Sequence, residues 1–180
     1  MYAPSMLATL AQMMKLRPLS VDDLSAARYI HATAFAGAAR NHYSPDDIDA
    51  FTAFIRSPRY ADLLLGNHAI AACIGSEMVG TAAWSAGEPP SPTARILAVF
   101  VRPMFTGEGI GRQLVGCIED EARTAGYQAV EVSATLNAVG FFQDLGYLLV
   151  REGAWALPLG HEMPVAFMRK ASFVGLQAAN

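Results

Sequence analysis

A glycine-rich turn between an apolar strand and an amphipathic helix constrains this chain more than any other feature. Residues 95–101 (RILAVFV) have the pattern of a strand, and residues 107–111 (GEGIG) lead from it into a helix. Backbone N–H groups at a helix start have no intrahelical acceptor and lie at the positive end of the helix dipole. Because glycine lets the backbone approach an anion closely, the segment predicts a phosphate site. Such turns also occur where nothing binds, so the turn alone leaves both interpretations open.

Two familiar phosphate motifs do not fit this turn. A Rossmann fingerprint, G-x-G-x-x-G, would need glycine at position 112, where the chain has Arg112. A P-loop would need Gly-Lys followed by Ser or Thr, which the sequence does not contain. A phosphate site here therefore belongs to another kind of strand-turn-helix unit.

Size and composition predict one domain with a small-molecule partner. The 180 residues, 53% of them hydrophobic, suffice for one sizeable core. Charged residues make up 16%, against about 25% in average proteins, so some surface must be apolar or buried against a partner, for which a homodimer is our expectation. With a formal charge of -3 and no run of Lys or Arg, we expect no nucleic-acid partner.

The chain ends and the cysteines predict a cytoplasmic protein. Residues 1–13 lack the basic region and long apolar stretch of a signal peptide, and no segment approaches the roughly 20 apolar residues of a membrane span. Cys73 and Cys117 lie far apart, which favours neither a disulfide framework nor a metal cluster. We expect no membrane partner and no metal, with a tail at 1–13, one domain at 14–172 and a second tail at 173–180.

Hydrophobic periodicity and capping residues predict an α/β fold. Ser20 and Ser44 each begin a helix, and Gly126 and Gly146 each end one. Two antiparallel strands followed by a strand-helix-strand-helix-strand unit imply a mixed, largely antiparallel sheet with helices on both faces. The expected strands are 14–18, 68–75, 78–85, 95–101, 128–133, 147–151 and 163–169, and the expected helices are about 21–38, 45 onward, 58 onward, 110–125 and 137–145.

Two segments at a characteristic separation carry a family resemblance. VFVRPMFTGEGIGRQLVGCIEDEA and the later LNAVGFFQDLGY together resemble the cofactor-binding and following motifs of the Gcn5-related N-acetyltransferases. The resemblance is sharp over about 95–150, and the C-terminal HEMPVAFMRK is similar to the final strand of bacterial members that act on small molecules. The rest of the chain agrees in element order.

The resemblance implies acetyl-CoA as co-substrate and a splayed strand pair that receives it. Main-chain groups of Val99 and Val101 would bind the pantetheine amides, as in strand addition, and amides of 107–112 would hold the pyrophosphate. Phe141 is equally typical of an ordinary core aromatic residue. The implied cofactor-binding residues are Val99, Phe100, Val101, Thr106, Gly107, Glu108, Gly109, Ile110, Gly111, Arg112, Asn137 and Phe141.

The sequence departs from the family pattern at two positions. Thr106 stands where Gln or Arg usually opens the turn, which removes a long side chain but leaves the amides. Phe142 stands where the family often has a Tyr whose hydroxyl protonates the departing thiolate, and Phe cannot donate a proton.

Acyl transfer needs a neutral amine, a polarised carbonyl and a proton for the thiolate. Residues 95–101 contain no carboxylate, so we expect water-mediated deprotonation. The candidate catalytic residues are Ser133 at a strand end, His42 in a loop and Tyr147 near the lost Tyr, although a solvated His and a half-buried sheet Tyr are the commoner interpretations.

The acceptor amine is expected between residues 35–46 and 153–162. Aromatic residues with a carboxylate would suit a cationic amine there, although Asp46 and Asp47 are also typical of a helix N-terminus. The predicted acceptor-binding residues are Phe35, Tyr43, Trp84 and Trp155, with His42, His161 and Glu162 as further lining.

These observations predict an N-acetyltransferase that moves an acetyl group from acetyl-CoA to the primary amine of a small molecule or peptide by direct attack in a ternary complex. One alternative is a catalytically weak acyl-CoA-binding sensor or interaction module of the same fold. Another is an enzyme that uses a different phosphate ligand, such as a nucleotide.

Overall fold

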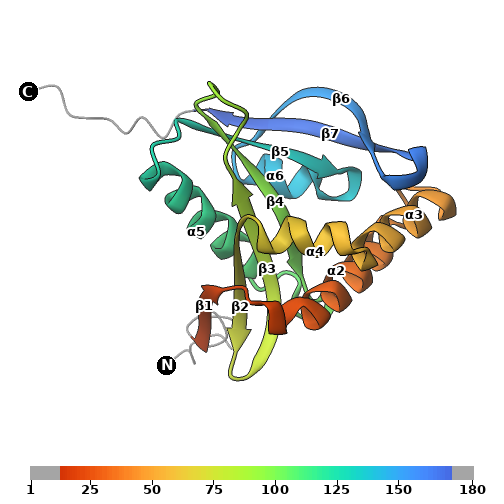
Figure 1. Cartoon of the computed structure of the whole chain (residues 1–180), viewed down its shortest axis with the longest axis horizontal. Coiled ribbons are helices and arrows are strands. Elements are labelled where there is room, and N and C mark those ends of the chain that lie inside the picture. Colours follow the sequence, from red (N-terminus) through yellow and green to blue (C-terminus); the bar gives the residue numbers. More distant parts are fainter. Residues whose placement is uncertain (1–12, 172–180) are drawn as a thin grey trace, which may run out of the picture.

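A computed structural model describes residues 13–171 as one mixed α/β unit (Figure 1). Residues 1–12 and 172–180, which include most of the predicted tails, lie outside the described range. The strands are β1 (Met14–Pro18), β2 (His68–Ile74), β3 (Glu77–Ser85), β4 (Thr93–Val101), β5 (Ala129–Thr135), β6 (Leu148–Ala156) and β7 (Glu162–Ala171). The helices are α2 (Leu24–Ala39), α3 (Pro45–Arg56), α4 (Pro58–Leu65), α5 (Ile110–Thr124) and α6 (Val139–Asp144), with short 3-10 turns η1 (Val21–Asp23), η2 (Pro103–Phe105), η3 (Leu136–Ala138) and η4 (Pro158–Gly160).

The seven strands form one sheet in the order β1-β2-β3-β4-β5-β7-β6. Within residues 13–171 every neighbouring pair is antiparallel except β4 and β5, which run parallel and are joined through α5. The predicted fold class, a largely antiparallel mixed sheet with helices on both faces, is confirmed.

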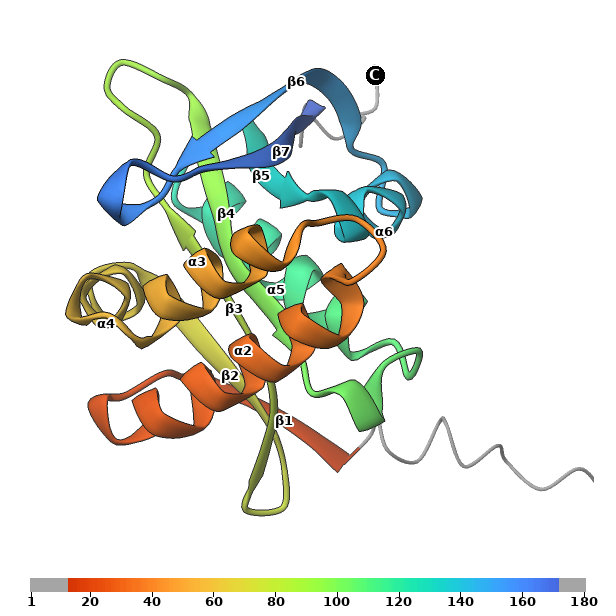
Figure 2. The same ribbon diagram turned by 90° about the vertical axis from the view of Figure 1, so that its right-hand side faces the viewer.

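Helices cover the two faces of the sheet with separate cores. Helices α2, α3 and α4 lie on one face, and α5 and α6 lie on the other (Figure 2). On the α5 face, Leu114 and Ile118 pack against Ile96 and Val132. On the α2 face, Phe35 and Ile55 are fully enclosed. Because strand side chains alternate between faces, Phe100 of β4 belongs to the core of the α2 face, whereas its neighbours Val99 and Val101 belong to the core of the α5 face.

Local capping explains where the helices of the α2 face begin. The Ser44 hydroxyl accepts the Asp47 N–H at 3.2 Å, and the Asp47 carboxylate accepts the Ser44 N–H at 3.1 Å, which forms the predicted capping box. Ser57 caps α4 by a single hydrogen bond, in which its hydroxyl accepts the Tyr60 N–H at 3.3 Å. These caps fix the position of α3 and α4 over the sheet.

The structure differs from the sequence prediction at the C-terminal strands. Strand β6 runs to Ala156 instead of ending near 151, and residues 153–162 comprise the end of β6 and the turn of a β6–β7 hairpin. The physical reason is pairing with β7, which holds this segment in an extended conformation although its sequence, REGAWA, lacks a run of β-branched residues.

No helix among residues 13–171 is both long enough and apolar enough to cross a bilayer. Cys73 and Cys117 are both free thiols.

Candidate active site

The sheet opens between its two parallel strands. β4 and β5 pair from Thr93 with Ala129 to Ile96 with Val132, and their register ends there although both strands continue. Beyond Ile96, the edge of β4 that faces β5 therefore has no neighbouring strand to receive its hydrogen bonds. Open backbone groups of this kind can pair with the amides of an extended ligand.

A bulge in β4 lies at this opening. The register between β3 and β4 shifts between Thr81 and Ala83, and Ala98 has a φ of +50°, in the left-handed region that residues with a Cβ rarely adopt. Such a conformation costs of order 1–3 kcal/mol and persists when its surroundings hold it. The bulge re-aims the backbone at Ala98 and at Val99, whose main-chain groups the resemblance assigns to the pantetheine amides.

A buried chain of hydrogen bonds holds the bulge. The Thr81 hydroxyl donates to the Ala98 carbonyl at 2.8 Å, and His31 Nε2 lies 2.7 Å from the same hydroxyl oxygen. His31 Nδ1 lies 2.7 Å from the Tyr60 hydroxyl, and its ring stacks on Phe100 at 4.3 Å. Because the Thr81 proton is directed to Ala98, Nε2 must carry the imidazole proton and Tyr60 must donate to Nδ1.

Burial keeps this chain neutral. His31 is 0% exposed, and burial lowers its pKa to about 3, since a charged imidazole would lose its hydration there. Burial also raises the pKa of the Tyr60 hydroxyl. Both groups therefore keep the protonation that the hydrogen-bond directions require.

A groove of about 740 Å³ surrounds the opening. It reaches from Ala138 and Phe142 on the α6 side to Phe51 and Tyr60 on the side of α3 and α4, so it passes both faces of the splayed strands. The lining also includes Leu63 of α4, Ser85 of β3, residues 95–100 of β4, residues 131–135 of β5, Val150, Arg151 and Trp155 of β6, and residues 167–169 of β7.

The glycine-rich turn forms the N-terminus of α5. Gly107 and Gly109 have φ values of +88° and +78°, and Gly109 is the N-cap residue. The first intrahelical hydrogen bond runs from the Gln113 N–H to the Gly109 carbonyl at 3.1 Å, so the amides before Gln113 have no acceptor within the helix. Arg112 is exposed beside them.

Close packing behind the turn explains another glycine. A Cβ at Gly111 would lie 3.1 Å from the Phe141 ring, so this position lets α5 and α6 approach each other. Phe141 and Phe142 pack edge to face at 5.1 Å. Phe142 is 4% exposed and brings no hydroxyl to the groove.

Two acceptor oxygens, in the segments that follow β4 and β5, are buried. Asn137 Oδ1 in η3 and Glu108 Oε2 in the turn have no hydrogen-bond partner within residues 13–171. A buried acceptor without a donor is costly, and Asn137 Oδ1 lies on the segment that follows β5. The N–H groups of a pantetheine arm are donors of the required kind.

A splayed parallel strand pair, a helix N-terminus with free amides and an unpaired buried acceptor together define a class of protein. The class comprises enzymes that bind a coenzyme A thioester between two strands and transfer its acyl group.

The comparison with family models identifies the family. Residues 30–147 match the Acetyltransferase (GNAT) family, and the chain belongs to that family. It is an acyl-CoA-dependent acetyltransferase with acetyl-CoA as co-substrate. No curated protein matches the chain in sequence.

Solved structures support the same fold. A GCN5-related N-acetyltransferase from Rhodopseudomonas palustris is 24% identical, with a TM-score of 0.78 over 87% of this chain and 94% of its own. The PaiA N-acetyltransferase from Thermoplasma acidophilum, solved with coenzyme A, is 16% identical, with a TM-score of 0.68 over 88% and 98% of the two chains. YncA from Salmonella typhimurium, solved with acetyl-CoA, is 20% identical, with a TM-score of 0.60 over 93% and 97%.

Of the three predicted catalytic side chains, the structure places only Ser133 in the groove. The Tyr147 hydroxyl is buried on the α5 face and donates to Glu119 Oε1 at 2.7 Å, and burial raises its pKa. His42 is exposed in the turn between α2 and α3 and does not line the groove. Tyr147 therefore has a structural partner, and His42 has no contact with the groove.

The predicted acceptor-binding aromatics are dispersed. Trp155 lines the groove and packs against Phe51 at 5.9 Å. Phe35 is enclosed in the core of the α2 face. The Tyr43 hydroxyl donates to the Pro164 carbonyl at 2.7 Å and accepts the Leu136 N–H at 2.8 Å, so it links β7 to η3.

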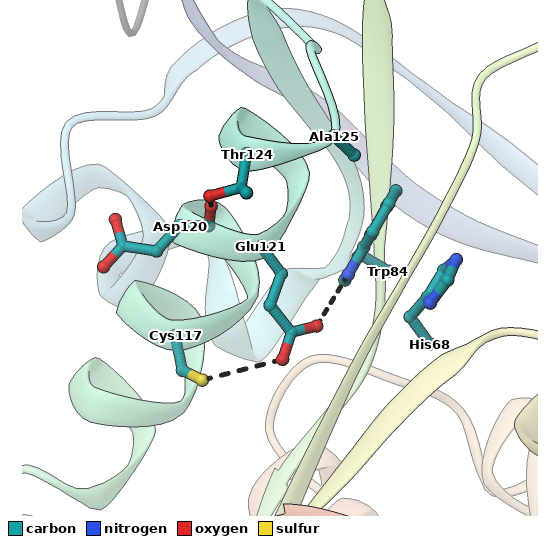
Figure 3. Close-up of a pocket in the computed structure, with 7 residues that line it drawn as sticks. All are labelled: His68, Trp84, Cys117, Asp120, Glu121, Thr124 and Ala125. Carbon is teal, nitrogen blue, oxygen red and sulfur yellow. Dashed lines mark hydrogen bonds between the residues drawn. The ribbon is translucent and has the colours of Figure 1, made fainter.

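Trp84 lies on the opposite face of the sheet from α3 and α4. Its indole N–H donates to Glu121 Oε2 at 2.9 Å, and its ring stacks on His68 at 4.2 Å, in an open hollow beside α5 (Figure 3). The side chain does not line the groove because the alternation of β3 directs residue 84 toward α5.

The predicted acidic residues serve the fold. The carboxylate of Asp47 closes the capping box and accepts from His161 Nε2 at 2.7 Å, which ties the β6–β7 hairpin to the start of α3. Burial alone would raise the pKa of Asp47, but hydrogen bonds from Ser44 and His161 lower it. Asp46 and Glu162 are exposed and do not line the groove.

Sequence reasoning missed the charged groups of the groove. Arg95, Glu131, Arg151 and Arg169 all line it. Arg95, Glu131 and Arg169 each interrupt a largely apolar strand, but neither the pairing of these strands nor their order could be read from the sequence.

Proposed function

We propose that the protein transfers an acetyl group from acetyl-CoA to the primary amine of a small molecule, by direct attack in a ternary complex. The observation that carries the proposal is the end of β4–β5 pairing at Ile96 and Val132, inside a groove that reaches both faces of the sheet. Acetyl-CoA and an amine can enter such an opening from opposite sides.

The cofactor side would use backbone groups. Main-chain groups of Val99 and Val101 would pair with the pantetheine amides, and the amides at the start of α5 would hold the pyrophosphate. Arg112 would add positive charge, and Asn137 Oδ1 would accept an N–H from the pantetheine arm. The support for these roles is the open edge of β4, the free helix amides and the unpaired Asn137 oxygen.

The chemical step would run through one tetrahedral intermediate. The neutral amine attacks the thioester carbon while the N–H at Val99 polarises the carbonyl, and a C–N bond forms as one amine proton passes to water. The intermediate then collapses, the C–S bond breaks, and the thiolate takes a proton, so that one amide and one free thiol result. Orientation of the two substrates supplies much of the acceleration.

Ser133 would position the water that carries the proton. Its side chain lines the groove on β5, opposite the open edge of β4, and it is exposed to solvent. Phe142, which stands at the usual acid position, has no proton to donate. We therefore assign the role of proton carrier to a water bound at the Ser133 hydroxyl.

Release of free thiol from acetyl-CoA across a panel of amines tests this function. We expect acceptor-dependent release that Gly109→Glu abolishes, because the added carboxylate would repel the pyrophosphate at the helix start. Gly116→Glu is the matched control, since Gly116 lies two turns further along α5 and a Cβ there meets nothing within 4 Å.

Coenzyme A binding without turnover of any amine would favour an acyl-CoA sensor. Phe142 supports that interpretation because it cannot donate a proton to the thiolate. Turnover that Gly109→Glu leaves unchanged would contradict the assignment of the cofactor site.

A further inference from the structure

The acceptor end of the groove is positively charged although the chain is not. Its charged lining residues are Arg95, Arg151 and Arg169 against one carboxylate, Glu131, which gives a formal charge of 3 − 1 = +2. The chain as a whole carries -3. A local charge of opposite sign to the molecule is typical of a site that attracts an anion.

The three guanidinium groups come from three strands. Arg95 on β4 stands opposite Glu131 on β5, and Glu131 stands opposite Arg169 on β7, so these residues form one row across the sheet. Arg151 on β6 stands opposite Phe167, two residues before Arg169 on β7. Because residues two apart on a strand share a face, all four charged side chains belong to one side of the sheet.

The three arginines differ in the hydrogen bonds and ion pairs that their guanidinium groups already form. Arg95 pairs with Glu131 at 3.1 Å and with Glu88 at 3.5 Å. Arg169 Nη2 donates to the Thr93 hydroxyl at 3.3 Å. Arg151 lies 3.7 Å over the Phe167 ring and has no carboxylate partner among residues 13–171.

A stacked arginine is well suited to bind an anion. The ring contact holds the guanidinium plane and leaves its N–H edges free for a planar, bidentate acceptor such as a carboxylate, or for a phosphate. The only carboxylate of the groove, Glu131, is already engaged by Arg95. The remaining cationic edges therefore favour an anionic ligand over a cationic one.

The arginine row lies at a distance from the reacting centre. Arg95 precedes Val99 by four residues of β4, a separation of at most about 13 Å because of the bulge at Ala98, and Arg151 and Arg169 belong to β6 and β7. Ser133 lies between the arginine row and the reacting centre, since it follows Glu131 by two residues on β5. This places an amine and an anionic group at opposite ends of one bound molecule.

We propose that the acceptor is a small amine that also carries a carboxylate or phosphate group, which Arg151, with Arg169 and Arg95, binds at the end of the groove away from the thioester. The inference rests on the proposed acetyl transfer and names the class of its acceptor.

The test compares matched acceptors that differ only in the anionic group. Linear ω-amino acids of increasing length are compared with their amides, and aminoalkyl phosphates with the corresponding amino alcohols, by thiol release. We expect kcat/KM to be at least about 10-fold higher for the anionic member of a pair, a size typical of one charge-assisted contact. The better of the carboxylate and phosphate series identifies the anion, and the best chain length gives its spacing.

Variants of Arg151 connect the preference to this site. Arg151 is exposed on an edge strand, so Arg151→Gln should leave the fold intact. We expect it to lower kcat/KM for the anionic member much more than for the neutral member, so that most of the preference is lost, and Arg151→Lys to restore part of it. Arg59→Gln, which removes the same charge from an exposed position of α4 outside the groove, is the control and should change neither.

A binding measurement separates failure of this inference from failure of the proposed function. Trp155 lines the groove, so its fluorescence in a Trp84→Phe protein loaded with coenzyme A reports acceptor binding without turnover. Tighter binding of the anionic members supports the inference even where no thiol is released, in which case only the transfer reaction fails. Equal binding of acids and amides, or preference for cationic amines, overturns it.

Discussion

The proposed cofactor side, which extends from the open edge of β4 to the start of α5, and the proposed acceptor side, in the groove, are built from different parts of the chain. The cofactor side consists mainly of backbone: the open edge of β4, the amides at the start of α5 and the segment after β5. The acceptor side consists of side chains that β4, β5, β6, β7, α3 and α4 bring together.

The difference shows which kind of site a sequence can reveal. A backbone site requires local features, such as glycines with positive φ, and these appear in one contiguous motif. A side-chain site requires the correct strand order, because Arg95, Glu131 and Arg169 become neighbours only through pairing of three strands. The cofactor side can therefore be common to a family while the acceptor side differs from one member to another.

The largest effect is expected from a substitution that disrupts the cofactor side alone. We expect Gly109→Glu to weaken coenzyme A binding at least about 100-fold. Its carboxylate would take the place of the pyrophosphate at the helix N-terminus and repel it, and its side chain would have to adopt a φ of +78°. Isothermal titration with coenzyme A measures the loss. Gly116→Glu on the same helix should bind normally, and an equal loss in both variants would show that the helix, not the turn, had been disturbed.

A smaller effect is expected where the two sides meet, at the bulge. Thr81→Val would leave the Ala98 carbonyl and the His31 N–H buried without partners, which should lower the free energy of unfolding by about 2 kcal/mol. If the bulge aims the Val99 amide at the thioester carbonyl as proposed, kcat should fall about tenfold while the coenzyme A Kd changes little.

Thr81→Ser retains the hydroxyl and should recover most of both losses. A variant in which kcat is unchanged while stability falls would limit the hydrogen-bond chain to a structural role.

A lowered pH should destabilise the protein through the same chain of hydrogen bonds, because His31 belongs to it. Its pKa is 6.5 when unfolded and about 3 in the fold, so between these values the unfolded chain binds more protons and stability falls as the pH is lowered. From pH 7 to pH 5.5 the loss should be about 1 kcal/mol. Urea unfolding at several pH values measures it.

His31→Gln keeps a donor and an acceptor but cannot titrate over this range, so its stability should depend less on pH between 5.5 and 7. Identical pH profiles for the two proteins would contradict the buried neutral imidazole.

The smallest expected effect lies on the acceptor side. Asp47→Asn weakens both the cap of α3 and the contact with His161 that holds the β6–β7 hairpin, at a cost of about 0.5–1 kcal/mol. We expect the acceptor KM to rise a few-fold while the coenzyme A Kd is unchanged. A change in coenzyme A affinity would show that the two sides are not independent.

Much of the fold was predictable because its signals are local. Ser44 and Gly126 marked helix ends, and alternating or continuous apolar runs marked strands, all of which the structure bears out. The length of β6 was not predictable, since pairing with β7 rather than intrinsic propensity keeps residues 152–156 extended.

The candidate site divides in the same way. The glycine turn and Asn137 could be found from a motif, whereas Tyr60, His31 and Thr81, although far apart in sequence, form one chain of hydrogen bonds. The prediction of an aromatic acceptor site failed for Trp84 because the face to which a strand residue points depends on register.

The parallel pairing of β4 with β5 also bears on the order in which the chain folds. Strands β1 to β4 pair antiparallel with their neighbours, as do β5, β7 and β6, so the sheet consists of two antiparallel units joined by a parallel ladder of four residue pairs. Hairpins close short loops, whereas this ladder requires a crossover through α5 and hence a larger loss of chain entropy. We therefore expect this ladder, which borders the proposed acetyl-CoA site, to form later than the β3–β4 and β6–β7 hairpins, and its amides to exchange hydrogen sooner than those of the hairpins.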